Sequence, residues 1–416
     1  MVGGQGLAWL ALAAGGLGGS LVKGWIDEHA VRLDPVTYEP DVKDAARLAP
    51  LDAALRVATV VFLGETNHFV HEKADFRLWW LRRLAGRRPL VIGEELGWSD
   101  GHDISRYLRT GDERHLDQAA TFGGTSHRRA DRDDRPKGVF KASNDAYPTA
   151  LFKAEQTRFY QGLRALPGIR RFFGFDIDVA GTGYLDIRGH ARHDPAFWRR
   201  LEQVPGESMA EEAERLERAL TMLPDDDCEL RADLAAAITS LRYTQMVNDA
   251  TCYDAARPAM AYREDVMKRH LERELRLIAD GDVLVLMAHA AHLAKDDAGI
   301  RGHGVGPGGN LVPSLGHHLV HDLGLRPYSI WMVYGGGTDS QPLPDLPNEA
   351  TYPRDSLNAL LGRHGLPLVV PTAPAASGIL AEPVGIGQMY NQVIPVHLPT
   401  QADAVFFLPN VSPLRA

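Results

Sequence analysis

Four short apolar runs in the sequence each end in an acidic residue or a histidine. The runs are residues 60–64 before Glu65 and His68, 90–93 before Glu94 and Glu95, 172–175 before Asp176, and 283–288 before His289 and His292. Such runs, bounded by glycine and followed by helical pattern, are typical of strands buried on both faces of a parallel sheet. Because open parallel sheets place their sites at the carboxyl ends of the strands, we expect Glu65, His68, Glu95, His289 and His292 to share one cleft.

The spacing of apolar residues between these runs predicts helices. Residues 72–84 have broadly helical spacing, and an amphipathic turn begins at residue 103. Residues 205–278 are rich in Glu, Arg, Leu and Ala and predict a helical insertion between the third and fourth core strands. Further apolar runs at 328–334, 366–370 and 404–408 predict the remaining strands. Strands that alternate with helices predict an α/β fold, with a mainly parallel central sheet flanked by helices.

Three segments do not follow this pattern. Residues 7–22 are apolar, but no Lys or Arg precedes them, so they fit neither a secretory signal nor a membrane helix well. We expect residues 1–24 to be a poorly ordered extension of a cytoplasmic protein whose folded domain spans 25–416; a signal or an anchor is the alternative. Residues 122–146, of which 123–136 have almost no apolar content, predict a surface loop or a lid over the cleft. A G-x-G-x-x-G string within residues 302–310 follows no strand, so we do not expect it to bind a nucleotide.

The composition restricts the class of partner. The chain has 416 residues, of which 44% are hydrophobic and 24% charged, as in ordinary globular proteins. A net charge of -9 argues against nucleic acid, because phosphate binding needs clustered Lys and Arg. Cys228 and Cys252 could bridge in an oxidising compartment, but their number and spacing favour packing residues. We therefore expect a small-molecule substrate and no membrane partner; the oligomeric state stays open.

The polar residues of the expected cleft suit ester hydrolysis. Such a reaction needs a base that takes a proton from water, a group that orients the base, and donors for the oxyanion. Histidine suits the first task because its ordinary pKa of about 6.5 lies near working pH. Glu65, three residues before His68, could orient that ring, and Glu95 could do the same or bind a proton. His289 and His292 would share one face of a helical turn, where either could donate to an oxyanion.

The same segments resemble the erythromycin esterase family, which includes relatives in polysaccharide biosynthesis. Residues 64–68 look like its G-E-x-x-H motif, and Glu72 and Arg77 stand at the spacings of its next acid and arginine. Residues 91–98 resemble the strand that ends in its second glutamate, which falls on Glu95. Residues 262–267 are similar to its R-D-x-x-M helix, 289–292 to its H-N-x-H motif, and 402–407 to its closing strand. The resemblance covers residues 25–413.

The resemblance implies a hydrolase that needs no metal or other cofactor. His68 would activate water, Glu65 and Glu95 would orient and polarise, and the substrate or its oxyanion would be bound by His289, His292, Arg77 and Glu72. The implied substrate is a carboxylic ester or a macrocyclic lactone, as in antibiotic inactivation or secondary metabolism. Two departures bear on the substrate: Ala290 replaces the family's Asn, and residues 123–146 stand where relatives have a shorter, more aromatic segment.

Four alternatives stay open. Three histidines and two carboxylates could hold zinc, although their spacing matches no compact metal motif. Residues 97–101 fit G-x-S-x-G with Ser99 as nucleophile, although residues 94–96 separate it from the apolar run. The same base and donors could instead form a lactone, transfer an acyl group or eliminate if water is excluded. A binding protein without catalysis is the fourth.

Overall fold

The computed structural model describes residues 17–119, 148–178, 206–225, 228–252, 254–300, 313–342, 348–373 and 380–416, together with residues 197, 199, 201 and 204. The loop expected at 122–146 and the glycine cluster at 302–310 lie outside the described residues, as do residues 1–16. Helix α1 (Leu17–His29) begins before the expected domain start and buries Trp25 and Ile26. The expected boundary at residue 25 falls inside this helix.

The centre of the molecule is an eight-stranded sheet in the order β1-β9-β12-β6-β2-β5-β3-β4. The strands are β1 (Val31–Arg32), β2 (Val60–Glu65), β3 (Leu90–Gly97), β4 (Ile169–Asp176), β5 (Val283–His289), β6 (Tyr328–Tyr334), β9 (Leu368–Pro371) and β12 (Ala404–Leu408). From β12 to β4 all neighbours are parallel, while β9 is antiparallel to β12 and β1 to β9. The predicted mainly parallel α/β fold is confirmed, and all seven predicted runs are strands of this sheet.

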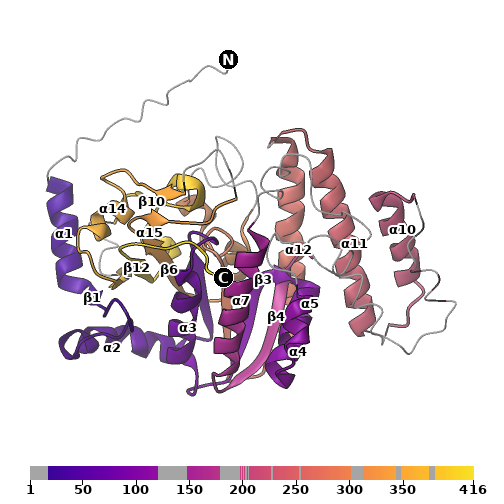
Figure 1. The fold of residues 1–416 in the computed structure, drawn as a ribbon, viewed down its shortest axis with the longest axis horizontal. Coiled ribbons are helices and arrows are strands. Elements are labelled where there is room, and N and C mark those ends of the chain that lie inside the picture. Colours follow the sequence, from indigo (N-terminus) through magenta and orange to yellow (C-terminus); the bar gives the residue numbers. More distant parts are fainter. Residues whose placement is uncertain are drawn as a thin grey trace, which may run out of the picture.

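Helices cover both faces of the sheet (Figure 1). One face carries α2 (Val42–Val57), α3 (Glu72–Leu84), α4 (Trp98–Thr110), α5 (Arg114–Gln118) and α7 (Thr149–Arg164). The other carries α12 (Arg257–Leu275), the short α13 (Leu315–His317) and the π-helical turn η6 (His318–Asp322). At one end of the sheet, α1, α14 (Leu357–Gly362) and α15 (Leu398–Gln401) enclose a further hydrophobic cluster. Outside the main sheet there are two small antiparallel pairs: β7 (Gly337–Thr338) with β8 (Glu349–Ala350), and β10 (Val384–Gly387) with β11 (Val393–Val396).

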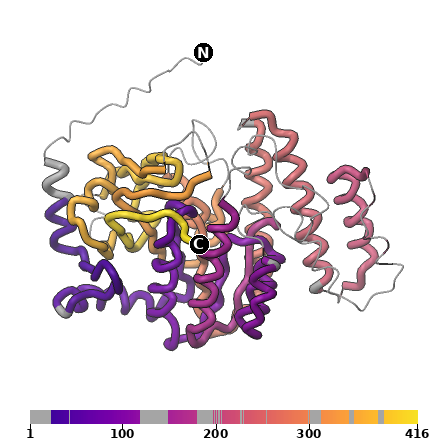
Figure 2. The backbone as a smooth tube through the Cα atoms, viewed as in Figure 1, coloured from indigo at the N-terminus to yellow at the C-terminus, as the bar shows by residue number. Residues whose placement is uncertain are grey.

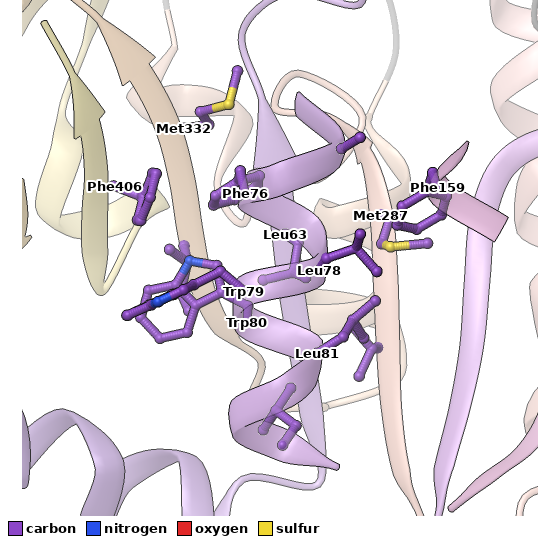
Figure 3. Close-up of a cluster of buried hydrophobic side chains, with 14 of the residues drawn as sticks. Leu63, Phe76, Leu78, Trp79, Trp80, Leu81, Phe159, Met287, Met332 and Phe406 are labelled. Atoms are coloured by element: carbon purple, nitrogen blue, oxygen red, sulfur yellow. The ribbon is translucent and has the colours of Figure 1, made fainter. Parts of the chain in front are cut away.

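The buried runs alternate between the two faces because successive side chains of a strand point to opposite sides. In β2, Val61 and Leu63 pack with α3, whereas Val60 and Phe62 pack with α12. Figure 3 shows the α3 side, where aromatic residues of α3 meet Phe406 of β12. An apolar run without alternation is therefore what a strand covered by helices on both faces requires.

The helical insertion consists of α10 (Met209–Leu220), α11 (Cys228–Asp249), the 3-10 turn η4 (Asp254–Ala256) and α12. A capping box of Ser208 and Glu211 begins α10. The helices α10 and α11 form a small core of their own with Leu216, Leu230 and Leu234. Figure 2 shows α10 and α11 at the end of the molecule opposite α1, whereas α12 packs on the sheet.

Two expectations about the surface can be checked here. Cys228 and Cys252 are both exposed and not bridged to each other, so the prediction that they are packing residues was wrong. Cys228 begins α11 at the surface, and its thiol donates to the carbonyl of Asp225 at 3.6 Å. Within the part of the chain that the structure describes, no helix combines the length and apolar character that crossing a membrane needs.

Candidate active site

Four neighbouring strands deliver polar side chains to one edge of the sheet. Glu65 ends β2, His289 ends β5 and Asp176 ends β4, while Glu94 and Glu95 lie near the end of β3. In the parallel register, Glu65 stands directly beside His289. The topology thus brings together groups that lie more than two hundred residues apart in the sequence.

The first group is built around His68. Its Nδ1 lies 3.2 Å from Oε1 of Glu65, and Nη2 of Arg77 donates to both oxygens of that carboxylate at 2.9 and 3.0 Å. Burial alone would raise the pKa of Glu65, but the Arg77 charge and the His68 hydrogen bond outweigh it and lower the pKa to about 2. Glu65 is therefore a carboxylate at any working pH, able to orient His68 and to stabilise its protonated form.

The turn that carries His68 is fixed on both sides. The hydroxyl of Thr66 donates to the carbonyl of Met332, and the amide of Asn67 donates to Tyr334 and Asp339. Asn67 Oδ1 in turn accepts from the backbone N–H of Phe69. These bonds link the end of β2 to the end of β6, so the turn that carries His68 is held rigidly.

Arg77 is a positioning residue. Its Nη1 donates to Glu94 while Nη2 holds Glu65, and the side chain is almost fully buried. Glu94 also accepts from Gln156 at 3.2 Å and from Tyr160 at 3.0 Å. From the sequence, Arg77 was expected to bind the substrate. In the structure, both of its terminal nitrogens bind protein carboxylates instead.

A second group is built around Glu95. Its Oε2 accepts from the backbone N–H of His289 at 2.8 Å, and its Oε1 accepts from Nη2 of Arg263 at 2.8 Å. Nε2 of His292 lies 3.2 Å from the same Oε1. Burial would raise the pKa of Glu95, but the nearby His292, His68 and Arg263 lower it well below its ordinary value. Arg263 also binds Asp176, which ties the end of β4 to this group.

His292 is a cation in this arrangement. Its ring lies between Glu95 and Glu264, whose Oε1 faces Nδ1. Burial opposes protonation, but the two carboxylates outweigh it and raise the pKa of His292 to about 10. Glu264 is itself held by the backbone N–H of Leu315 at 3.1 Å.

The two groups meet at a pair of imidazoles. The rings of His68 and His289 are 5.1 Å apart between centroids, and both residues are buried. Two adjacent residues of β3 point to opposite faces of the sheet: Glu94 binds Arg77 of α3, whereas Glu95 binds Arg263 of α12. The structure therefore brings together Glu65, His68, Glu95, His289 and His292, as the sequence predicts.

Lys73 is a residue near this site that the sequence analysis did not single out. It lies one helical turn before Arg77, is 5% exposed and has its ammonium 4.5 Å from the ring centroid of Phe152. Burial and the Arg77 charge lower its pKa to about 8, against the opposing pull of Glu65, Glu94 and Glu95. A narrow pocket with a water-accessible volume of about 10 Å³ opens beside it, lined also by His71, Phe152, Glu155 and Gln156. A lone lysine in a helix gives no sequence signal of this environment.

Glu72 and Ser99 have other partners. The carboxylate of Glu72 accepts from the backbone and the hydroxyl of Ser412, so it anchors the C-terminal segment and is not part of the assembled group. Ser99 is fully buried at the start of α4, and its hydroxyl donates to Asp178 at 2.7 Å. The flanking Gly101 is needed for packing, because a Cβ there would lie 2.0 Å from the backbone nitrogen of Gly174. The G-x-S-x-G string therefore reflects close contact between α4 and β4.

The predicted zinc donors do not converge as metal ligands. Among the described residues, one set of three side chains brings its ligand atoms within 4.8 Å of one another, and it consists of Asp296, His317 and His321. None of these is a predicted donor, and the carboxylates of the site are instead paired with Arg77, Arg263 and His292.

Three solved structures are similar to this chain. A crystal structure of a Bacillus cereus protein matches with a TM-score of 0.67 at 16% identity, covering 96% of this chain and 99% of the other. A succinoglycan biosynthesis protein matches with a TM-score of 0.65 at 16% identity, covering 95% and 97%. A variant of the erythromycin esterase EreC in its open conformation matches with a TM-score of 0.54 at 16% identity, covering 92% and 97%.

The chain has the erythromycin esterase fold. The resemblance that the sequence motifs indicate is thus confirmed at the level of the fold over nearly the whole chain. No family model matches the sequence, and no curated protein does. The erythromycin esterase fold is therefore recognised here through the arrangement of the elements, with little sequence identity left to support it.

Proposed function

We propose that the protein is a hydrolase that cleaves a carboxylic ester or a macrocyclic lactone with water activated by His68. The observation that carries the proposal is the pair of His68 and Glu65, in which a carboxylate fixed by Arg77 orients the imidazole. A base held in one orientation by a permanently charged acid is what activation of water needs. The similarity to an erythromycin esterase supports the same reaction class.

In the proposed reaction, His68 takes a proton from water while the oxygen attacks the ester carbonyl. The negative charge that develops on the carbonyl oxygen is stabilised by His289, which lies beside His68. His292 adds its positive charge to the site, while its two ring nitrogens face Glu95 and Glu264. When the tetrahedral intermediate collapses, the carbon–oxygen bond to the alcohol breaks, and His68 returns its proton to the leaving alkoxide. Glu65 stabilises the imidazolium between the two steps, and no covalent enzyme intermediate forms.

The substrate class is proposed as a small molecule with an ester or lactone carbonyl, as in antibiotic inactivation or secondary metabolism. Ala290, which is buried in an apolar cluster, replaces the family's Asn, so the hydrogen-bonding amide beside the two histidines is absent. Lys73, which interacts electrostatically with Glu65, Glu94 and Glu95, could donate to a polar group of the substrate away from the reacting carbonyl.

Acyl transfer without water is a second candidate, favoured by the low exposure of the two central rings. His68 is 5% and His289 is 2% exposed. A site that excludes water would allow an alcohol to attack the carbonyl in place of water, giving lactone formation or transesterification.

One experiment separates the two candidates. The purified protein is incubated with a panel of simple esters, lactones and macrolides in water enriched in oxygen-18, and the products are analysed by mass spectrometry. Hydrolysis adds one heavy oxygen to the acid product, whereas acyl transfer to an alcohol leaves the product unlabelled. His68→Ala serves as the control protein, and turnover that persists in it would remove His68 as the base.

A further inference from the structure

We propose that Asp296, His317 and His321 form a binding site for a divalent transition metal ion of the zinc class, separate from the candidate active site. One ligand atom from each of these side chains lies within 4.8 Å of the other two. The three come from two segments, the 3-10 turn η5 (Asp297–Gly299), which Asp296 precedes, and the α13–η6 turn. The proposal does not depend on the proposed hydrolase activity.

The donor types and their spacing suit this class of ion. Zinc binds imidazole nitrogens and carboxylate oxygens in a tetrahedron, where donors bonded at about 2.1 Å lie roughly 3.4 Å apart. His317 and His321 are four residues apart on a helical turn, so both rings project from the same side, with centroids 4.3 Å apart. Small side-chain rotations therefore suffice to close the set around an ion, and a fourth position remains for water.

A carboxylate supports one of the two rings from behind. Asp297 Oδ2 lies 3.3 Å from Nδ1 of His317, an ion-pair distance that a small rotation of the ring would turn into a hydrogen bond. Histidines that bind metals commonly donate their second ring N–H to such a carboxylate, which fixes the ring and makes it a better ligand. The intervening His318 differs, because its two ring nitrogens face Asp322 and Glu272. It is therefore not a candidate ligand.

The backbone that carries these ligands is held in place. The backbone of Asp296 is paired with the side chain of Gln401 in both directions, and Asp296 Oδ1 accepts from Ala298. The α13 turn packs directly on the segment after β5, since a Cβ at Gly316 would lie 2.5 Å from the carbonyl carbon of Leu293. Neither segment can drift away without breaking these contacts, so the site is largely preorganised.

A bound ion would join two segments that support His292. The hydroxyl of Ser314 donates to the carbonyl of Ala294, and the N–H of Leu315 donates to Glu264, the partner of His292. An ion at Asp296, His317 and His321 would fasten the α13–η6 turn to the segment after β5. The role we assign to the ion is structural, and its main effect is on stability.

The test uses the full chain, stripped of metal with a chelator and then desalted. Zinc chloride is titrated in equilibrium dialysis, and bound zinc is measured by elemental analysis beside protein concentration. We expect about one zinc ion per chain above the level of a His317→Ala, His321→Ala double variant, and a melting temperature raised by at least about 2 °C. Cobalt should give the absorption bands of a tetrahedral site.

Matched variants make the result decisive. His397→Ala removes a histidine outside the set, whose ring meets the carbonyl of Ala381, and should bind zinc like the parent. Asp297→Asn keeps the three ligands and should weaken binding about 10–100-fold. His321 is exposed, so His321→Ala alone is expected to fold and to lose the site. Equal zinc binding by His321→Ala and the parent, or no binding by the parent, would overturn the proposal.

Discussion

Glu65 holds Nδ1 of His68 at 3.2 Å while its two oxygens accept both hydrogen bonds from one nitrogen of Arg77. Arg77 thus holds the Glu65 carboxylate in place, and that carboxylate in turn orients the His68 ring. A ring held in this way keeps one tautomer and one direction, which a loop histidine alone would not keep.

His68→Ala should lower the turnover of any ester that the protein hydrolyses by about 10²–10⁴-fold, because general base catalysis typically contributes this much. The thermal unfolding curve should stay close to that of the parent, since the Arg77 contacts to Glu65 and Glu94 remain. Initial rates with the best substrate of the panel check the prediction, with His397→Ala as control. Unchanged rates in His68→Ala would exclude the mechanism.

Arg77→Met should lower the free energy of unfolding by about 3–5 kcal/mol, because it leaves Glu65 and Glu94 buried without their cation. Chemical unfolding in urea measures the change. Adding Glu94→Gln to the Arg77→Met variant should restore part of the lost free energy of unfolding, because it removes one buried charge. As a comparison, Arg114→Met breaks an exposed pair with Asp112 and should hardly alter stability. Equal losses in the two methionine variants would contradict the assigned role.

His292 should make stability depend on pH on the alkaline side. Its pKa in the folded protein is about 10, above its ordinary 6.5, so its contribution is fully present below pH 6.5 and is lost as the pH rises through 10. The stability difference between the parent and His292→Gln should therefore be largest near pH 6 and shrink towards pH 10. Urea unfolding at several pH values measures it. A difference that does not vary with pH would show that His292 is not a buried cation.

Lys73 should make the free energy of unfolding change with pH in the direction opposite to that of His292. Its pKa is lowered from 10.5 to about 8, so the unfolded chain binds more protons between these values, and this residue's contribution to stability rises with pH there. Lys73→Met should therefore raise the free energy of unfolding at pH 7, with a gain that shrinks above pH 8. If Lys73 binds substrate, the same variant should have a higher KM. If Lys73→Met were less stable than the parent at pH 7, the predicted destabilising effect of the Lys73 charge would be refuted.

Ser99→Ala should keep its activity per folded molecule. The hydroxyl is fully buried and bound to Asp178, so the loss of this bond affects stability, by about 1–3 kcal/mol, and leaves the reaction intact. Rates are compared at protein concentrations corrected for folded fraction. Labelling of Ser99 by a serine-directed phosphonate, with loss of activity, would instead favour a serine hydrolase.

The sequence predicts the sheet well because each central strand is buried on both faces. The ranges Tyr328–Tyr334 and Ala404–Leu408 are strands with the predicted bounds, and helix Glu72–Leu84 also has its predicted bounds. Strand β1 was missed, since two residues are too short to give a periodicity. Helix α1 was missed because its apolar residues lie among glycines, which are poor helix formers.

The site could be predicted only in part. Strand ends pointed to Glu65, Glu95 and His289, because the parallel topology determines where strand ends meet. The partners of these residues follow from distant pairings that no local pattern encodes, such as Arg263 with Asp176 or Glu72 with Ser412. The sequence therefore indicated the central residues and left their supporting contacts, and hence several of their roles, undetermined.

The central position of β2 has a consequence for biosynthesis. Its neighbours in the sheet are β5 and β6, whose residues begin at 283 and 328, so the strand that carries Glu65 has no partner until most of the polypeptide has left the ribosome. During that interval the apolar residues of β2 have no strand to pair with, so we expect the nascent chain to bind chaperones. Pairing over such separations is also slow to form. Heterologous production should therefore gain more from slower translation and lower temperature than from any change in the catalytic residues.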